Sequence, residues 1–287
     1  MYLYMNGRIA HEDDIRVSPF DHGFLYGLGL FETFRTYNGH PFLLDDHFHR
    51  LRESAGMVNI QFPSFEREEI LDTIKQLLNV NNLVDGYFRW NISAGDKGVG
   101  LYTDLYTEPN TIVYVKALPP NVDEKKGVIL EQRRNTPEGQ KRLKSHHYLN
   151  NVLGKREVGS NPNVEGIFLT EEGHVSEGVV SNIFWWKNKT LFTPSNEAGG
   201  LDGITKQFLI TLAQKQQLGV EEGLYPVDEL LQADEVFATN SIQEIVPLSS
   251  IEHRVFPGKK GVITKLLREE YAKRTSMLWS AKELKGE

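Results

Sequence analysis

The stretch RLKSHHYLNNVLGKRE, residues 142–157, decides which fold and chemistry the rest of the chain has to support. It predicts the end of a strand, Ser145 as an N-cap residue, and then a helix. The apolar residues of this helix recur at helical spacing: Tyr148, Leu149, Val152 and Leu153. Lys144 stands at the junction of strand and helix. When a lysine is removed from water, its ammonium form is disfavoured and a nucleophilic amine remains, which is the chemistry of Schiff-base enzymes.

Lys144 is one of five cations in and beside this stretch, together with Lys141, Arg142, Lys155 and Arg156. For any single lysine a solvated surface position is much the commoner role. The local pattern does not show that Lys144 is desolvated, so it leaves the choice among these cations open.

The composition is that of an ordinary water-soluble globular protein. The chain has 287 residues, of which 39% are hydrophobic and 25% charged, which suggests two domains or one large one. Its formal net charge of −7 gives no support for nucleic-acid binding. No apolar run is long enough for a membrane span, and the N-terminus lacks a secretory signal pattern. Without cysteine there is no disulfide framework or thiolate nucleophile. We expect a cytoplasmic protein that acts on small molecules.

The order of elements predicts an α+β fold. Two hairpins with Asn-Gly turns, amphipathic helices at 45–58 and 65–83, and further strands follow one another without a regular βαβ rhythm. The segment LPPNVDEKKG, residues 118–127, has the composition of a linker. We therefore expect an N-terminal domain at 1–120 and a C-terminal domain at 121–287.

Arg50 lies off the apolar stripe of the first helix, so periodicity gives it no buried role and a solvated arginine is the simplest interpretation. His47 and His49 lie two residues apart on the same helix and do not face one another. We therefore expect no metal site there.

Two junctions in the second half are suited to an anion. In LDGIT, residues 201–205, the backbone N–H groups of Gly203, Ile204 and Thr205 begin a helix. In ATNS, residues 238–241, Asn240 and Ser241 end a strand. Each junction alone is weak, because most such helix starts only cap themselves.

Together with a Schiff-base lysine, these junctions suggest pyridoxal phosphate. That cofactor requires a lysine, a phosphate site and an acid beside its ring nitrogen. Glu177, in VSEGVVSN, is a candidate for the acid, and a solvated turn glutamate is an equally good interpretation of the same residue.

Four separated segments resemble the fold-type-IV pyridoxal-phosphate enzymes, which include branched-chain and D-amino-acid aminotransferases and aminodeoxychorismate lyases. RLKSHHYLNNVLGKRE resembles the lysine segment of that family, EGVVSNIFW its acid segment, LDGITKQF its phosphate-binding helix start, and DDHFHRL its arginine segment. The resemblance extends from residue 6 to about residue 247. It implies two domains, a smaller N-terminal α/β domain and a larger C-terminal mixed-sheet or pseudo-barrel domain.

The resemblance also implies roles for individual residues. Lys144 would bind the cofactor covalently and later move a proton, and Glu177 would pair with the ring nitrogen. Phosphate would be held by Arg50, by the backbone of Ile204 and Thr205, and by the hydroxyl of Ser241. Tyr148 would contact the phenolic oxygen of the cofactor.

Within the family, four segments closely resemble those of the aminodeoxychorismate lyases: SPFDHGFLYGLGLFETFR, RRNTPEGQKRLKSHHYLNN, VEGIFLTEEGHVSEGVVSNIFW and TNSIQEIVP. This resemblance implies an enzyme that splits 4-amino-4-deoxychorismate into 4-aminobenzoate and pyruvate, a step towards folate. Such an enzyme implies a homodimer and a functional link to aminodeoxychorismate synthase. The alternatives are an aminotransferase for D-amino or branched-chain amino acids, and a metabolite-binding protein that kept the fold without catalysis.

Two departures weaken the D-aminotransferase alternative. Ala94 stands where many relatives have an arginine, and Phe31 stands where D-aminotransferases have a tyrosine. Arg89 is a candidate for holding a substrate carboxylate, although a solvent-facing strand position explains it equally well.

Overall fold

The chain folds as two units in a computed structural model that describes residues 1–285. The first unit comprises Met1–Pro119, Leu143–His147 and Ser276–Ser280, and the remaining described residues form the second unit. The chain first passes between the units at Pro119–Pro120, inside the segment expected as a linker. Residues 143–147, which include Lys144, return to the first unit, whereas the sequence suggested one uninterrupted domain from 121 onward.

Six strands form an antiparallel sheet in the first unit, in the order β2-β1-β6-β5-β3-β4. They are β1 (Tyr2–Met5), β2 (Arg8–His11), β3 (Gly29–Tyr37), β4 (His40–Pro41), β5 (Tyr87–Ser93) and β6 (Asn110–Lys116). The two predicted hairpin turns are confirmed. Asn38 and Gly39 both have positive φ, at 51° and 82°, as a two-residue hairpin turn requires.

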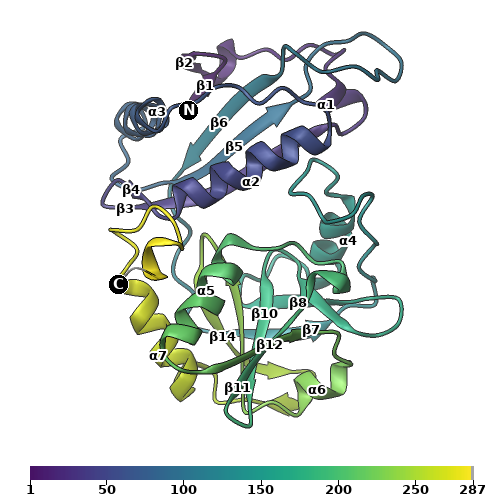
Figure 1. Ribbon diagram of the computed structural model, residues 1–287, viewed down its shortest axis with the longest axis vertical. Helices are drawn as coiled ribbons and strands as arrows, with labels where there is room; N and C mark the ends of the chain where they lie inside the picture. Colours follow the sequence, from purple (N-terminus) through teal and green to yellow (C-terminus); the bar gives the residue numbers. More distant parts are fainter. Residues whose placement is uncertain (286–287) are drawn as a thin grey trace. The chain divides into compact units, whose positions relative to one another are not determined.

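Helices α2 (Leu44–Met57) and α3 (Arg67–Val80) bury their apolar faces in one core with this sheet (Figure 1). Their predicted core residues Phe48, Leu51, Ile74 and Leu77 are buried. A reciprocal cap between Glu66 and Glu69 begins α3. The unit also contains the single turn η1 (Glu12–Asp14) and the short helix α1 (His22–Leu25).

The second unit is built on a mixed sheet of nine strands. Its order is β12-β11-β10-β13-β14-β7-β8-β9, with β15 paired to β14. The strands are β7 (Lys125–Ile129), β8 (Val164–Leu169), β9 (Val175–Gly178), β10 (Asn182–Lys187), β11 (Thr190–Pro194), β12 (Gly219–Gly223), β13 (Glu235–Asn240), β14 (Glu244–Ile251) and β15 (Arg254–Val255). The edge strand β9 also lies against β10, so the sheet curls back on itself.

Both faces of this sheet are covered, which explains the continuous apolar runs of its central strands. On one face, Ile183 and Val236 belong to a core that includes Leu230 of α6. On the other face, Phe184 and Phe237 stack with ring centroids 5.5 Å apart. The helices of this unit are α4 (Leu149–Val158), α5 (Ile204–Lys215), α6 (Val227–Leu231) and α7 (Val262–Ala272), with single turns at η2 (Asn196–Ala198), η3 (Gly258–Lys260) and η4 (Glu283–Lys285).

The fold agrees with the expected α+β class, because the first sheet is antiparallel and the second is mixed. The second unit has only two parallel crossovers through a helix among its described residues, β7–α4–β8 and β11–α5–β12, and they do not follow one another as a repeat. Within residues 1–285, no helix has the length and apolar character needed to cross a membrane.

Candidate active site

The lysine segment lies beside β3 in the first unit. The Phe31 N–H donates to the carbonyl oxygen of Lys144 at 2.9 Å, and the His146 N–H donates to the carbonyl oxygen of Gly29 at 2.9 Å. Ser145 is therefore paired with Leu30 as an added strand residue, and the prediction that it caps the helix is wrong. The helix begins later, at Leu149, with Tyr148 as its N-cap residue. Backbone pairing with a distant strand leaves no mark on local periodicity, so the sequence could not indicate it.

Lys144 and Arg89 both lie against the ring of Phe31. The Lys144 Nζ is 4.7 Å from the ring centroid, and the Arg89 guanidinium carbon is 3.5 Å from it. Arg89 Nε also donates to Asn91 Oδ1 at 3.0 Å. Phe31 is buried, while Lys144 and Arg89 are half-buried. The first unit thus gathers two cations around one aromatic ring, and neither side chain points simply to solvent.

His146 adds an uncharged imidazole to this group. Its ring occupies the space that a Cβ atom on residue 29 would fill, so only glycine fits at that position. Burial lowers the pKa of His146 from 6.5 to about 4, and the charge of Arg89 contributes to the same shift. The His146 Nε2 atom is buried and makes no hydrogen bond to any of residues 1–285.

Arg50 is held by a buried carboxylate rather than solvated. Its Nε and Nη2 atoms donate to the two oxygens of Glu32, each at 2.7 Å, and His47 Nδ1 lies 2.7 Å from Glu32 Oε2. Burial alone would raise the pKa of Glu32, but Arg50 and His47 outweigh burial and hold it at about 2. Glu32 and His47 therefore fix the direction of the arginine.

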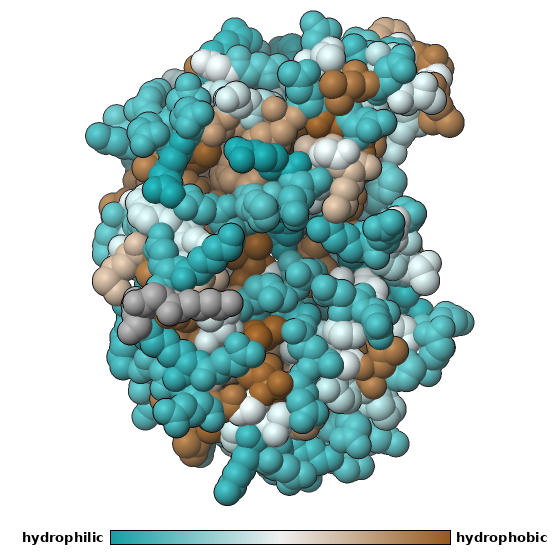
Figure 2. Space-filling view, in the orientation of Figure 1, coloured by the Kyte–Doolittle hydropathy of each residue, from teal (hydrophilic) through white to brown (hydrophobic). Residues whose placement is uncertain are grey.

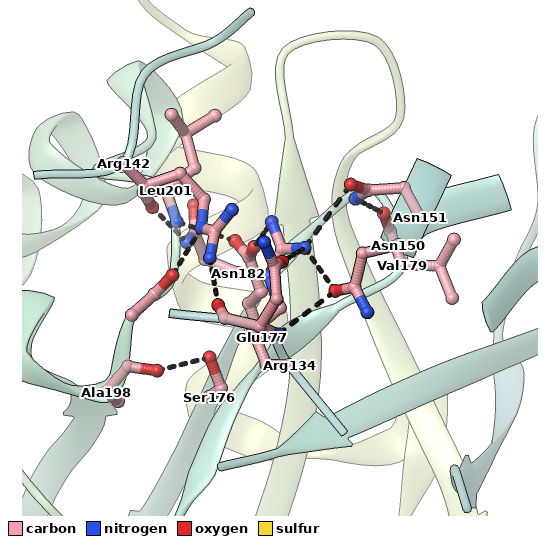
Figure 3. A network of polar contacts seen from close by, with 12 residues as sticks. Arg134, Arg142, Asn150, Asn151, Ser176, Glu177, Val179, Asn182, Ala198 and Leu201 are labelled. Atoms are coloured by element: carbon pink, nitrogen blue, oxygen red, sulfur yellow. Dashed lines mark hydrogen bonds and ion pairs between the residues drawn. The ribbon is translucent and has the colours of Figure 1, made fainter. Parts of the chain in front are cut away.

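Glu177 lies near the end of β9 in the second unit as a buried carboxylate with a partner on each oxygen. Its Oε1 atom lies 2.7 Å from Nη2 of Arg134, and its Oε2 atom accepts from the Leu201 N–H at 2.8 Å (Figure 3). The interpretation of Glu177 as a solvated turn residue is therefore excluded. An ionised carboxylate offers about four acceptor positions, so it can still accept from a further N–H donor.

The two junctions that we expect to bind an anion also meet in the second unit. Helix α5 begins at Ile204 as predicted, and the hydroxyls of Thr205 and Ser241 lie 3.2 Å apart. Gly203, the N-cap residue, lies so close to the Asn182 amide that a Cβ atom would collide with it. Asn240 Oδ1 instead accepts from the backbone N–H of Ile242 and Gln243 and shapes the turn. The arrangement gives a helix N-terminus and two hydroxyls to an anion such as a phosphate group.

Tyr148 lies half-buried at the start of α4, and its contact with a cofactor stays a prediction. The apolar residues that predicted this helix are exposed: Leu149, Val152 and Leu153. Its buried face is formed by Asn151 and Gly154, and a Cβ atom on Gly154 would collide with Phe168. The helix is thus confirmed, although its apolar stripe does not face the core of its own unit.

Comparison with known proteins identifies the family. The family model described as amino-transferase class IV matches residues 29–251. The chain belongs to the amino-transferase class IV family. It is 46% identical over 275 residues to the aminodeoxychorismate lyase of Bacillus subtilis (strain 168), covering 94% of each chain. It is 30% identical to the D-alanine aminotransferase of Bacillus licheniformis, covering 92% of this chain and 94% of that one.

A solved class IV structure supports the same fold. The branched-chain amino acid aminotransferase of T.th., complexed with N-(5'-phosphopyridoxyl)-L-glutamate, superposes with a TM-score of 0.83 at 27% identity, covering 96% of this chain and 94% of that one. The fold-type-IV architecture expected from the sequence is therefore confirmed.

No supporting role was predicted for three residues that hold the predicted ones, Glu32, His47 and Arg134. The sequence could have predicted that Glu32 is buried, because strand alternation places it on the same side of β3 as Leu30 and Phe34. A carboxylate on a core face needs a cation as its partner. Arg134 lies in an irregular segment where no periodicity marks which side chains are buried.

Proposed function

We propose that this chain is a pyridoxal-phosphate-dependent lyase that converts 4-amino-4-deoxychorismate to 4-aminobenzoate and pyruvate, a step in folate biosynthesis. The observation that carries the proposal is the 46% identity to a curated aminodeoxychorismate lyase across 94% of both chains. The match extends over 275 residues, so it is not confined to a single motif.

The side chains present are chemically suited to pyridoxal phosphate. Glu177 is a fixed carboxylate that can accept a ring N–H, and the α5 N-terminus with Thr205 and Ser241 can hold a phosphate group. A relative of the same fold is solved with a phosphopyridoxyl compound, which further supports this cofactor. When bound, the cofactor would supply an electron sink for the carbanion formed on the substrate.

Each candidate residue then has a task. We assign covalent attachment to Lys144, the ring nitrogen to Glu177, and contact with the phenolic oxygen to Tyr148. We assign binding of the phosphate to four groups: Arg50, the backbone N–H groups of Ile204 and Thr205, and the Ser241 hydroxyl. Glu32 and His47 would act indirectly, by holding Arg50 in one orientation.

Lys144 would also perform the proton transfer. Once the substrate amine has replaced Lys144 on the cofactor, the freed Nζ amine would take the proton from C4 of the substrate. The bond between the ring carbon C3 and the enolpyruvyl oxygen would break, and the ring would become aromatic. The departing enolate takes up a proton and becomes pyruvate. No oxidant or second substrate is required, since the atoms of the substrate equal those of the two products.

A paired product assay tests this function. Purified protein with pyridoxal phosphate is incubated with chorismate, glutamine and aminodeoxychorismate synthase, and 4-aminobenzoate is followed by fluorescence. We expect 4-aminobenzoate and pyruvate in equal amounts, and none from Lys144→Ala. Silence in this assay, combined with rapid amino transfer from an amino acid to 2-oxoglutarate, would overturn the lyase proposal.

An aminotransferase acting on D-amino or branched-chain amino acids is the second candidate. Its support is the relationship to curated aminotransferases, including 30% identity to a D-alanine aminotransferase. The same lysine and carboxylate would serve that reaction. The 2-oxoglutarate arm of the assay distinguishes the two, because a lyase releases pyruvate without an amino acceptor.

We further propose that the chain works as a homodimer in the cytoplasm, functionally linked to the synthase that makes its substrate. Exposed apolar side chains support self-association. In the first unit Phe24, Val99 and Leu101 are 75%, 80% and 86% exposed, and Figure 2 shows apolar atoms gathered over α1 and the loop after β5. The hydrogen bond from Gly100 N–H to Tyr26 Oη joins these two segments. Light scattering of wild type and a Phe24→Asp/Leu101→Asp double variant tests this, with a monomeric wild type as the contradictory result.

A further inference from the structure

The Glu177 carboxylate lies at the centre of a polar network confined to the second unit (Figure 3). The network contains charges and amides that the proposed catalytic roles do not use. Its members come from the segment before the lysine, from the start of α4, and from the loop that leads into α5.

Arg134 is the cation of this network, and it is almost completely buried. While Nη2 pairs with Glu177, Nη1 donates to Asn150 Oδ1 at 2.6 Å and lies 3.4 Å from Asn151 Oδ1. The fork of the guanidinium thus spans Glu177 on one side and α4 on the other. A lysine could not make these contacts together, because it carries a single point charge.

The two asparagines are themselves fixed by backbone carbonyls. Asn150 Nδ2 donates to Arg133 O at 2.9 Å, and Asn151 Nδ2 donates to Val179 O at 2.6 Å. Val179 lies two residues after Glu177, so Asn151 connects the chain next to the carboxylate with the arginine that pairs with it. This gives a task to the Asn-Asn pair of the 142–157 stretch.

The second donor to Glu177 is fixed by a second arginine. Leu201 donates its N–H to Glu177, and its carbonyl oxygen accepts from Asn182 Nδ2 at 2.8 Å. Arg142 Nε donates to the carbonyl oxygen of Gly199 in the same loop. Burial lowers the pKa of Arg142 to about 10, with a further contribution from Arg134, so it remains charged at neutral pH.

Both oxygens of Glu177 therefore have partners that are themselves held. Such a carboxylate cannot rotate towards a ligand, and a ligand must meet it in the orientation that the network imposes. Burial of the pair also means that loss of Arg134 leaves a carboxylate without its counter-ion in a low-dielectric site.

We propose that Arg134, oriented by Asn150 and Asn151, is the positioning residue that directs the Glu177 carboxylate at the ring nitrogen of the cofactor, while Arg142 holds the loop that supplies the second donor. This inference rests on the proposed pyridoxal-phosphate function. Arg134 acts only through Glu177 and touches neither cofactor nor substrate. Its loss leaves the Glu177 carboxylate in place but no longer held in one orientation, so the hydrogen bond to the ring N–H weakens and the protonated ring nitrogen becomes less stable.

The test uses holoenzyme reconstituted with pyridoxal phosphate labelled with ¹⁵N in the ring, because the ¹⁵N resonance separates protonated from neutral ring nitrogen without any turnover. Arg134→Gln is compared with Arg133→Gln, its exposed neighbour in the chain. We expect the resonance of Arg134→Gln at neutral pH to move towards the neutral position and cofactor affinity to fall about tenfold or more. Arg133→Gln should match wild type in both.

Two further variants distinguish a wrong role for Arg134 from a wrong proposed function. Asn151→Ala keeps the ion pair and should give a smaller shift in the same direction, which preserves the test where Arg134→Gln does not fold. A wild-type resonance in Arg134→Gln and Asn151→Ala, together with a moved resonance in Glu177→Gln, overturns the role of Arg134 and leaves the proposed function intact. Wild-type protein that binds no cofactor overturns both.

Discussion

Each unit contains a carboxylate–guanidinium pair with a buried carboxylate, and the two pairs differ in the exposure of the arginine. In the first unit Glu32 is 1% exposed and Arg50 14% exposed, so the arginine is the outer member. In the second unit Glu177 and Arg134 are 6% and 4% exposed, so both members are buried to the same degree. Both pairs have a closest separation of 2.7 Å.

The comparison indicates how the same two residue types serve different ligands. A buried ion pair is costly to desolvate, so its presence is weak support for a purely stabilising role. Where the carboxylate is the inner member, the pair presents a cation suited to phosphate. Where the arginine is held from behind by amides, the pair presents a carboxylate suited to a ring N–H.

Removal of either carboxylate should give the largest loss of stability. Glu32→Gln removes the counter-ion of Arg50 and the hydrogen-bond partner of His47, and Glu177→Gln removes the counter-ion of Arg134. We therefore expect each substitution to lower the free energy of unfolding by about 3–5 kcal/mol in cofactor-free protein. Urea unfolding measures this. Glu53→Gln, on the exposed side of α2, is the control and should change it by less than about 1 kcal/mol. Equal stability of all four proteins would show that neither pair is energetically important.

The pair of Glu32 and Arg50 should make the stability of the protein depend on pH under acidic conditions. The pKa of Glu32 is about 2 in the folded protein against 4.5 ordinarily. A lowered carboxyl pKa contributes stability above the ordinary value, and that contribution disappears as pH falls from 4.5 to 2. We expect wild type to lose roughly 3 kcal/mol more than Glu32→Gln across this window. Parallel curves for the two proteins, measured by urea unfolding at each pH, would mean that Glu32 is not stabilised as an anion.

Binding of pyridoxal, which lacks the phosphate group of pyridoxal phosphate, should distinguish the role of Arg50 from that of Arg134. Arg50→Gln is expected to weaken pyridoxal phosphate by about 1.5–3 kcal/mol without affecting pyridoxal, which lacks the phosphate group. Arg134→Gln should weaken both ligands alike, since it acts at the ring. Equilibrium binding of both compounds to cofactor-free protein provides the measurement. If Arg50→Gln weakened pyridoxal equally, the assignment of Arg50 to phosphate would be wrong.

The smallest effect is expected from His146, whose charged form is opposed by burial and by Arg89. Its pKa is lowered from 6.5 to about 4, so the folded state resists protonation and loses stability as pH falls from 6.5 to 4. We expect this part of the loss, about 2 kcal/mol for a ring that is only partly buried, to be absent in His146→Gln. His147→Gln, an exposed neighbour, is the control and should retain it. Urea unfolding across this pH range provides the measurement, and identical curves for wild type and His146→Gln would contradict the expectation.

The sequence predicted those parts of the molecule that depend on local patterns. Helix α3 follows from the spacing of Ile70, Ile74 and Leu77, and the first two hairpins follow from their Asn-Gly turns. The start of α5 at Ile204 follows from the glycines before it. Each of these signals lies within about ten residues of the feature that it determines.

The features that the sequence did not predict depend on contacts between distant segments of the chain. Pairing of Ser145 with Leu30 displaced the helix start by several residues, and the burial of Arg134 is set by α4 and β9 together. The apolar stripe of α4 predicted a helix correctly, but periodicity could not tell that this stripe faces outward. The candidate roles of Lys144 and Glu177 came from the family resemblance, because neither stands out by local pattern alone.

The most direct test of this account is to trap the cofactor on its lysine. Holoenzyme is reduced with borohydride and digested, and the modified peptide is sequenced by mass spectrometry. The account predicts one phosphopyridoxyl group per chain, on Lys144 within the 142–157 stretch, and none on Lys141 or Lys155. Modification of either of those residues, or no modification of Lys144 in protein saturated with pyridoxal phosphate, would contradict it.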